Sequence, residues 1–192
     1  MSEREDLRVK RTKKALSEAF IKLLESKPLD EITVNELCDV AGVRRATFYK
    51  HYSDKFDFIT AYTCALRDEF DSLVWKSDKP TPTKEYYVAY AKRVVGFISE
   101  NSKAVDNIYR SNLFPSFLAI IVEQNYKDTC ERLHASVKAG MKLNASVEVT
   151  ASMCSGGVSA TIFEWLRSGK KEDPDALADQ VGRVVAAAIE CK

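Results

Sequence analysis

The chain has 192 residues, of which 45% are hydrophobic and 30% are charged, which is enough for the core of one domain or of two small ones. The net charge of +1 excludes a polycation, so any affinity for nucleic acid must come from local placement of charge. The 5 cysteines are widely spaced in apolar helical patterns, which predicts reduced thiols and argues against a disulfide framework or a zinc site. Residues 3–11 are charged, and no apolar run approaches the roughly 20 residues of a membrane span, so we expect a soluble, cytoplasmic protein that contacts no membrane.

The first third of the chain predicts four helices. The first carries an apolar stripe of Leu16, Phe20, Leu23 and Leu24 and ends before Pro28. Thr33 and Glu36 form a T-x-x-E capping box for a short second helix, whose inward residues we predict to be Val34, Leu37, Val40 and Ala41. Gly42 supplies a turn with positive φ, and a third helix runs from about Arg45 to Tyr52. Ser53 or Asp54 caps a fourth helix, with an apolar stripe of Phe56, Ile59, Thr63, Leu66, Phe70 and Leu73.

The rest of the chain is also helical in its apolar spacing. Pro80 and Pro82 mark a break in a polar segment, 76–84. Further helices are predicted from about Thr83, over about 102–111, from Pro115 to roughly Lys142, over 146–168, and after Asp173-Pro174 to about Glu190. We therefore expect an all-α protein of about nine helices, with a helix-turn-helix domain in residues 1–55 and a helical regulatory and dimerisation domain in 56–192, in which helix 56–75 is the connector.

The third helix carries an unusual outward face. If Phe48 points inward, Tyr52 lies about 40° away on the same side, at about 100° per residue. Ala46, Thr47, Tyr49 and Lys50 then point outward beside Arg44 and Arg45, with no acid among them. An ordinary exposed helix would account for the inward aromatic residues but not for the missing acids.

This face is typical of the second helix of a helix-turn-helix, which enters the major groove of DNA. Arg45 could bind guanine and the methyl group of Thr47 could meet thymine. Tyr49, Lys50, His51 and Lys55 are better placed for phosphates. A second basic cluster, residues 8–14, precedes or opens the first helix, where an arm could cross the DNA backbone; the alternative is an ordinary solvated N-terminus.

Several spaced positions in about residues 10–60 resemble the DNA-binding domain of the TetR (tetracycline repressor) family of transcriptional regulators. They include Ile32-Thr33-Val34, Ala41-Gly42-Val43 and Thr47-Phe48-Tyr49-x-His51-Tyr52. The resemblance implies an N-terminal three-helix DNA-binding domain and a C-terminal domain that dimerises and often holds a ligand. Carried over by position, it implies DNA contacts at Thr33, Arg44, Arg45, Ala46, Thr47, Tyr49, Lys50, His51 and Lys55. Arg44 departs from the small polar residue frequent at this N-cap, and we predict that it gains a phosphate or a base instead.

Residues 84–192 match the family only in layout, and two features suggest self-association. Gly156, Gly157 and Ala160 would let helices approach closely, and Val181, Val184 and Val185 stripe the last helix. With Phe163, the residues predicted at a homodimer interface are Gly156, Ala160, Phe163, Val181, Val184 and Val185; the alternative is packing within one chain. The aromatic residues predict a small-molecule pocket lined by Tyr90, Phe97, Phe117 and Phe163, or simply a core.

No catalytic, metal or cofactor motif stands out. The two histidines, His51 and His134, form no metal-ligand pattern, and Gly156-Gly157 lacks the strand that a nucleotide-binding loop requires. We therefore predict that the protein is not an enzyme and needs no cofactor. The expected function is a transcriptional repressor that binds a palindromic operator in double-stranded DNA as a homodimer and is released by a small-molecule effector. The alternative is a helical protein–protein interaction module without operator binding.

Overall fold

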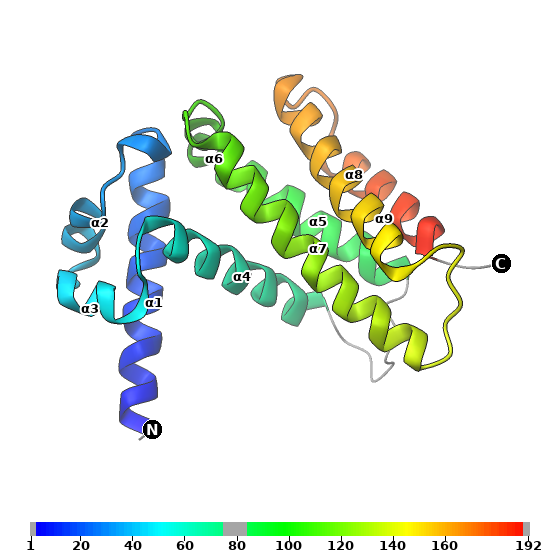
Figure 1. The fold of residues 1–192 in the computed structure, drawn as a ribbon. Helices are drawn as coiled ribbons and strands as arrows, with labels where there is room; N and C mark the ends of the chain where they lie inside the picture. Colours follow the sequence, from blue (N-terminus) through cyan, green and yellow to red (C-terminus); the bar gives the residue numbers. More distant parts are fainter. Residues whose placement is uncertain (1–2, 75–83, 190–192) are drawn as a thin grey trace. The chain divides into compact units, whose positions relative to one another are not determined.

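The computed structural model describes residues 3–74 and 84–189, and within these ranges it is built of helices alone (Figure 1). The prediction of an all-α fold is confirmed. The elements are α1 Glu3–Leu24, the 3-10 turn η1 Leu29–Glu31, α2 Val34–Ala41, α3 Arg45–His51, α4 Lys55–Val74, α5 Lys84–Glu100, α6 Ser102–Tyr109, α7 Phe114–Lys138, α8 Val147–Arg167 and α9 Pro174–Ile189. None of the described helices is long and apolar enough to cross a membrane.

The chain divides into two compact units. The N-terminal unit contains residues 1–63 and 101–118, and the C-terminal unit contains residues 64–100 and 119–192. The N-terminal unit therefore extends past residue 55 and takes in α6 and the start of α7. The break predicted at 76–84, with its prolines and the cap at Thr83, falls almost wholly outside the described residues.

Local sequence signals set the ends of α2, α3 and α4. The Thr33 hydroxyl accepts a hydrogen bond from the Glu36 backbone N–H, and the Glu36 carboxylate accepts one from the Thr33 N–H, which completes the predicted capping box. Gly42 ends α2 at φ 63°, in the left-handed region that glycine enters without steric cost. The Asp54 carboxylate accepts hydrogen bonds from the N–H groups of Phe56 and Asp57, so Asp54 caps α4.

Aromatic rings fill the core of the N-terminal unit, with Phe58 at the centre. Its ring centroid lies 5.3 Å from that of Phe20, 5.2 Å from Tyr52, 6.0 Å from Phe48 and 6.3 Å from Tyr62. These rings come from α1, α3, its C-cap and α4, so one cluster fixes the inner side of the helix-turn-helix.

The predicted inner faces of α2 and α4 are wrong at three positions. In α4, Phe56 is 40% exposed and Leu73 is 46% exposed, and the residue that enters the core is Phe58. Val40 of α2 is 43% exposed, whereas its neighbour Cys38 is buried. In both helices the apolar residues outnumber the places in the core, so periodicity alone left the choice of inward residue ambiguous.

Residues 101–118 attach to the end of α1 and to η1 within the N-terminal unit. The Ser111 hydroxyl donates to Asp30 Oδ1 at 2.6 Å, and the Asn112 amide donates to Asp30 Oδ2 at 3.1 Å. The Asn107 amide donates to the carbonyl oxygen of Leu24 at 2.8 Å. The hydrogen bond from Ser111 is the main reason that the pKa of Asp30 lies below its usual value. Segments about 80 residues apart in sequence are thus joined by side-chain hydrogen bonds.

The C-terminal unit is organised around the close packing of α5 and α9. Gly182 of α9 lies so near to α5 that a β-carbon there would meet the backbone of Val88. Trp165 at the end of α8 is buried in the same cluster as Val95 and Leu177, and its indole N–H donates to the carbonyl oxygen of Glu172. The last two helices both have N-terminal caps: Ser146 accepts from the Val149 N–H, and Asp173, the predicted cap of α9, accepts from the Ala176 N–H. The four cysteines of the described part of the chain are free thiols, as predicted.

Candidate nucleic-acid interface

The third helix, α3, has one buried side and one exposed side. Phe48 is 0% exposed, whereas the next residue, Tyr49, is 50% exposed. Of the other predicted contacts, Arg44, Arg45, Ala46 and Lys50 are exposed, and Thr47 and His51 are half-buried. The predicted orientation of α3, with Phe48 and Tyr52 inward, is confirmed.

Arg44 is the N-cap of α3 and has extended backbone angles, φ −66° and ψ 139°. Its side chain makes no capping hydrogen bond to the helix, so the exposed guanidinium is not used to hold the turn. The first turn of α3 has no acidic residue, and the last turn carries Lys50 and His51. The exposed surface of α3 is therefore positively charged along its length.

Two of the predicted contacts are occupied within the N-terminal unit. The Thr33 hydroxyl lies 2.9 Å from Glu36 Oε2, to which it donates, while it also accepts from the Glu36 N–H. The Lys55 ammonium donates to the carbonyl oxygens of Leu29 and Ile32, at 3.0 and 2.8 Å. Burial lowers the pKa of Lys55. The side chains of Thr33 and Lys55 thus help to hold their own unit together, which distinguishes them from the exposed residues of α3.

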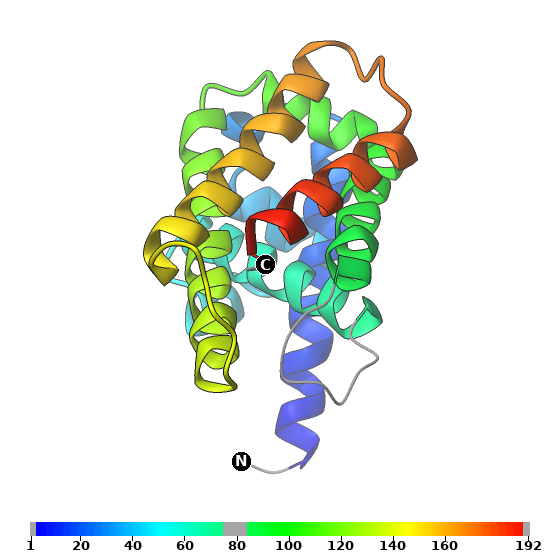
Figure 2. The ribbon, with the colours of Figure 1, turned by 90° about the vertical axis from the view of Figure 1, so that its right-hand side faces the viewer.

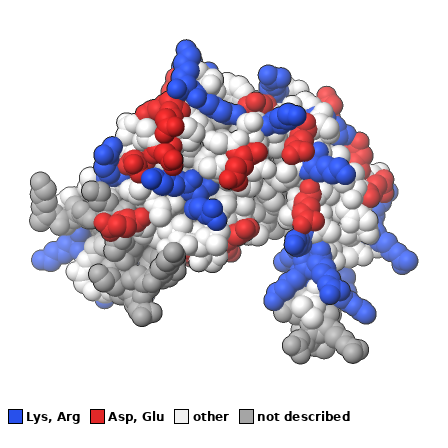
Figure 3. Space-filling view, turned by 180° about the vertical axis from the view of Figure 1, so that it is seen from behind, with Lys and Arg blue, Asp and Glu red and all other residues white. Residues whose placement is uncertain are grey.

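The basic residues of the N-terminus lie inside a helix and not in an extended arm. Residues 8–14 belong to α1, and Arg8, Lys10, Arg11, Lys13 and Lys14 are all exposed. Figure 3 shows lysine and arginine side chains gathered around this part of the helix. The sequence left open whether these residues precede or open the first helix; they lie within it, because the chain is helical from Glu3 onward.

The residues predicted at a dimer interface fall into two groups. Val184 is 69% exposed and Ala160 is exposed, whereas Val181 and Val185 pack against the core clusters of their own chain and Gly156 and Phe163 are half-buried. Met153 and Val149 on α8, which were not among the predicted interface residues, are 72% and 50% exposed. Helical spacing on a mostly apolar helix did not separate its exposed side from its buried side.

The four residues predicted for a ligand pocket are divided between the two units. Tyr90 and Phe97 of α5 lie beside Phe70 of α4, with ring centroids 6.5 and 5.5 Å away. Phe163 is on α8 of the same unit, but Phe117 belongs to the N-terminal unit.

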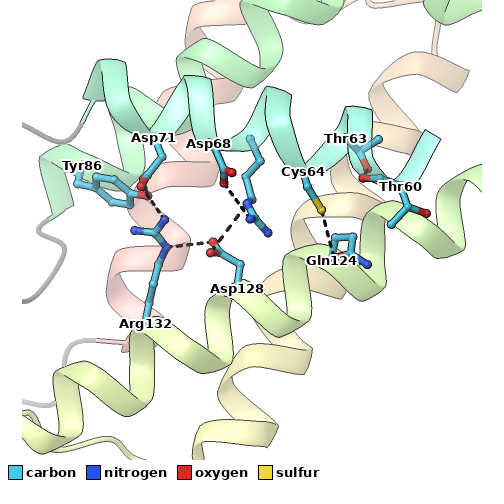
Figure 4. A network of polar contacts seen from close by, with 10 residues as sticks. Thr60, Thr63, Cys64, Asp68, Asp71, Tyr86, Gln124, Asp128 and Arg132 are labelled. Atoms are coloured by element: carbon cyan, nitrogen blue, oxygen red, sulfur yellow. Dashed lines mark hydrogen bonds and ion pairs between the residues drawn. The ribbon is translucent and has the colours of Figure 1, made fainter. Parts of the chain in front are cut away.

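Beside these rings, a polar network joins α4, α5 and α7 (Figure 4). The Arg132 guanidinium donates to Asp71 at 2.7 Å and to Asp128 at 3.0 Å, and the Tyr86 hydroxyl donates to the other oxygen of Asp71. Burial is the main reason that the pKa of Tyr86 lies far above its usual value. Opposite charges are paired here, so the network holds the C-terminal half of α4 against its neighbours.

Comparison with known proteins gives the family. The family model TetR_C_8, described as a transcriptional regulator C-terminal region, matches residues 80–186, more than half of the chain. The chain belongs to the TetR family of transcriptional regulators. The family is one of regulators and not of enzymes, as the sequence predicted.

Individual relatives of this TetR-family chain are distant. It is 40% identical over 55 residues to the uncharacterised HTH-type transcriptional regulator YxbF of Bacillus subtilis (strain 168), a match that spans 28% of this chain and 14% of that protein. Among solved structures, a putative TetR-family regulator from Rhodococcus sp. has a TM-score of 0.67 at 14% identity, covering 94% of this chain and 100% of its own. The fatty acid degradation regulator FadR of Bacillus halodurans has a TM-score of 0.62 at 14% identity, and the match covers 92% of this chain and 99% of the FadR chain. At such identities the likeness establishes the fold alone.

Proposed function

We propose that this TetR-family regulator binds double-stranded DNA in a sequence-specific manner through α3, as a homodimer on a palindromic operator, and represses transcription there. The observation that carries the proposal is the exposed, acid-free surface of α3 opposite the fully buried Phe48. A helix held so firmly on one side can present its other side to a groove without rearrangement.

The proposed contacts divide by chemistry. Arg45 and Thr47, in the first turn of α3, are assigned to base edges, because a guanidinium pairs with guanine and a methyl group packs on thymine. Ala46 lies between Arg45 and Thr47, and its small side chain lets the helix approach the bases closely. Arg44, Tyr49, Lys50 and His51 are assigned to phosphates, which fix the position of the helix and not the sequence. Thr33 and Lys55 are left out, because the Thr33 hydroxyl and two of the three N–H donors of Lys55 form hydrogen bonds within their own unit.

The proposed dimer interface is the exposed side of α8 and α9. Val149, Met153 and Val184 are large apolar residues that are 50%, 72% and 69% exposed. Gly156 and Gly157 lie in the middle of α8, where glycine costs about 1 kcal/mol relative to alanine, and a β-carbon at either would meet nothing within 4 Å in this chain. Close approach of a second copy would explain both the glycines and the exposed side chains, and a two-fold axis would place the two α3 helices on one palindrome.

We place the effector site in the C-terminal unit, near the rings of Phe70, Tyr90 and Phe97. An effector acts only through different affinities for the DNA-bound and free states. The polar network on α4 is the element that such a ligand would disturb, because α4 continues into the N-terminal unit. A ligand of this site should raise the melting temperature of the free protein and lower its affinity for the operator.

Selection of bound sequences from a pool of random duplexes tests the proposal. The expected result is a near-palindrome bound with nanomolar affinity that falls steeply as salt is raised. A protein that selects no duplex, or whose binding does not depend on salt, would instead be a helical interaction module. A selected site without two-fold symmetry would retain DNA binding and overturn the homodimer.

A further inference from the structure

Arg67 of α4 carries a buried hydrogen-bond donor that no described residue satisfies. Its terminal nitrogen Nη2 donates to Asp68 at 2.9 Å, but Nε is buried and has no hydrogen-bond partner in the described part of the chain. Asp128 Oδ1 lies 3.9 Å from this Nε, which is beyond hydrogen-bond distance. A buried donor without an acceptor destabilises a fold, and native proteins rarely leave one unused. The packing of the unit therefore gives no reason for a donor at this position.

Asp128 of α7 is the acceptor that faces this donor. Its other oxygen, Oδ2, accepts from Arg132 Nε at 3.0 Å, and a carboxylate has room for further hydrogen bonds. The side chains of Arg67 and Asp128 are only 20% and 22% exposed. Figure 4 shows the Asp128 side chain pointing from α7 toward α4. A single atom between Nε and Oδ1 can lie within hydrogen-bond distance of both, because 3.9 Å is well below the sum of two such bonds.

Aromatic rings lie beside this donor and acceptor. Phe70 follows Arg67 by three residues, which places both on the same side of α4, and the Phe70 ring centroid is 6.5 Å from that of Tyr90. Burial, and next the charge of Asp128, raise the pKa of Tyr90, whereas the charge of Arg67 lowers it, so the Tyr90 hydroxyl lies near both groups. These side chains come from α4, α5 and α7 of the C-terminal unit, whose α8 and α9 lie side by side between α5 and α7 in Figure 2.

The partly buried charges around this place balance each other. Four side chains, two positive and two negative, are at most 25% exposed: Arg67, Arg132, Asp71 and Asp128. Asp68 is 69% exposed, so solvent screens its charge. A carboxylate between Nε and Oδ1 would be repelled by Asp128, and an ammonium would be repelled by Arg67. A neutral group avoids both penalties.

We propose that the effector is a phenol, a neutral aromatic molecule whose hydroxyl oxygen accepts from Arg67 Nε and donates to Asp128 Oδ1. This inference rests on the proposed effector site, for which it names the class of ligand. A hydroxyl donates and accepts through one atom, whereas a carbonyl or an ether only accepts. The phenol ring packs among the rings of Phe70 and Tyr90. The hydroxyl bridge joins α7 to α4, the helix that continues into the N-terminal unit.

Naphthalenes that differ in one substituent test the class of ligand on the full chain without DNA. The probes are naphthol, methoxynaphthalene, naphthoate and naphthylmethylammonium, all substituted at the same ring carbon. Calorimetric titration gives the affinity of each probe, and thermal unfolding gives its effect on the melting temperature. Naphthol should raise the melting temperature and bind about tenfold more tightly than each of the others, a ratio that one hydrogen bond to a charged group supports. Absence of naphthol binding, or equal binding of naphthol and methoxynaphthalene, would overturn the inference.

The variant Arg67→Lys tests the donor. Lysine keeps the charge but has a methylene group where arginine has Nε. The variant should bind naphthol about tenfold more weakly than the wild type and should keep the wild-type affinity for methoxynaphthalene. The matched control is Arg93→Lys, at an exposed arginine of α5, which should keep both affinities. Far-UV circular dichroism verifies that each variant is folded. An Arg67→Lys variant that binds naphthol as tightly as the wild type would show that Nε is not the donor and would overturn the inference.

Failure of this inference is distinguishable from failure of the proposed function. Naphthol that binds as expected but leaves the affinity for the selected duplex unchanged is not an effector, and this result would overturn the inference while DNA binding stands. Release of the duplex by a compound without a hydroxyl, with no effect of naphthol, would also overturn it and would retain a regulator released by another class of effector. If the wild type binds no duplex, the proposed function fails, whereas the titrations with naphthol need no DNA and still show whether this site takes a phenol.

Discussion

The ammonium of Lys55 lies 2.8 Å from the carbonyl oxygen of Ile32 and also donates to Leu29. Ile32 ends η1 just before α2, and Lys55 begins α4 just after α3. One side chain thus joins the two ends of the helix-turn-helix. Lys55, predicted from the sequence to contact a DNA phosphate, uses two of its three N–H donors to hold the fold that presents α3.

Lys55→Met should lower the free energy of unfolding by about 1.5–3 kcal/mol, because hydrogen bonds from a charged group to two carbonyls are lost. Urea unfolding checks this value. The matched variant is Lys50→Met on the exposed side of α3, which should change stability by less than about 0.5 kcal/mol. For DNA binding we expect the opposite order of effects. Lys50→Met should reduce the slope of log K against log salt by about 0.9. Lys55→Met should leave this slope unchanged once the affinity is corrected for the fraction of folded protein. A reduced salt slope in folded Lys55→Met would return this residue to the DNA contacts.

Glu36 should make stability depend on acid pH. A hydrogen bond from Lys27, and then those from Thr33, lower the pKa of Glu36 from 4.5 to about 2. A depressed pKa in the folded state stabilises the protein above the unfolded pKa, and this stabilisation is lost as pH falls from about 4.5 to about 2. Glu36→Gln keeps the capping box but removes the charge. The difference in urea midpoint between wild type and Glu36→Gln should be constant above about pH 4.5 and shrink below it. A difference that stays the same down to about pH 2 would contradict this assignment.

Gly182→Ala should destabilise the C-terminal unit. The added β-carbon would lie 2.5 Å from the Cα of Val88, so α9 or α5 must move. The cost of overpacking is about 1–3 kcal/mol, partly offset by the higher helix propensity of alanine. The control is Gly96→Ala in the middle of α5, where the new β-carbon meets nothing within 4 Å and stability should rise by up to about 1 kcal/mol. Thermal unfolding of both variants gives the comparison. Equal effects of the two substitutions would show that α5 and α9 are not in such close contact.

Local signals predicted much of the N-terminal unit. The capping box of Thr33 and Glu36, the positive φ of Gly42 and the inward side of α3 each depend on a few neighbouring residues, and all are confirmed. What one sequence could not give are contacts between distant segments, such as Ser111 with Asp30 or Gly182 with Val88. The two hydrogen bonds of Lys55 belong with these contacts, since their acceptors lie more than 20 residues earlier in the chain.

The exposed apolar side of α8 and α9 predicts the oligomeric state. Met153→Glu or Val184→Glu would bury a charge without a partner twice in each symmetric dimer, at a cost of about 3 kcal/mol or more. Sedimentation velocity should therefore find a dimer for the wild type and a monomer for each variant. Val137→Glu is the control, because Val137 is an exposed valine of α7, 41% exposed, outside the proposed interface. A monomeric wild type at micromolar concentration, or variants that remain dimeric, would rule out this interface.

Substitution of Arg45 shows whether α3 recognises base sequence. Arg45 is exposed in the first turn of α3, so its substitution should leave folding unchanged. The measurement is the affinity of wild type and Arg45→Ala, by fluorescence anisotropy, for the selected duplex and for duplexes with one base pair exchanged in each half-site. We expect Arg45→Ala to lose about 1–3 kcal/mol of binding free energy on the selected duplex and no longer to distinguish the base at one symmetric pair of positions. Wild-type affinity and wild-type base preference in Arg45→Ala would show that α3 does not recognise base sequence through this residue.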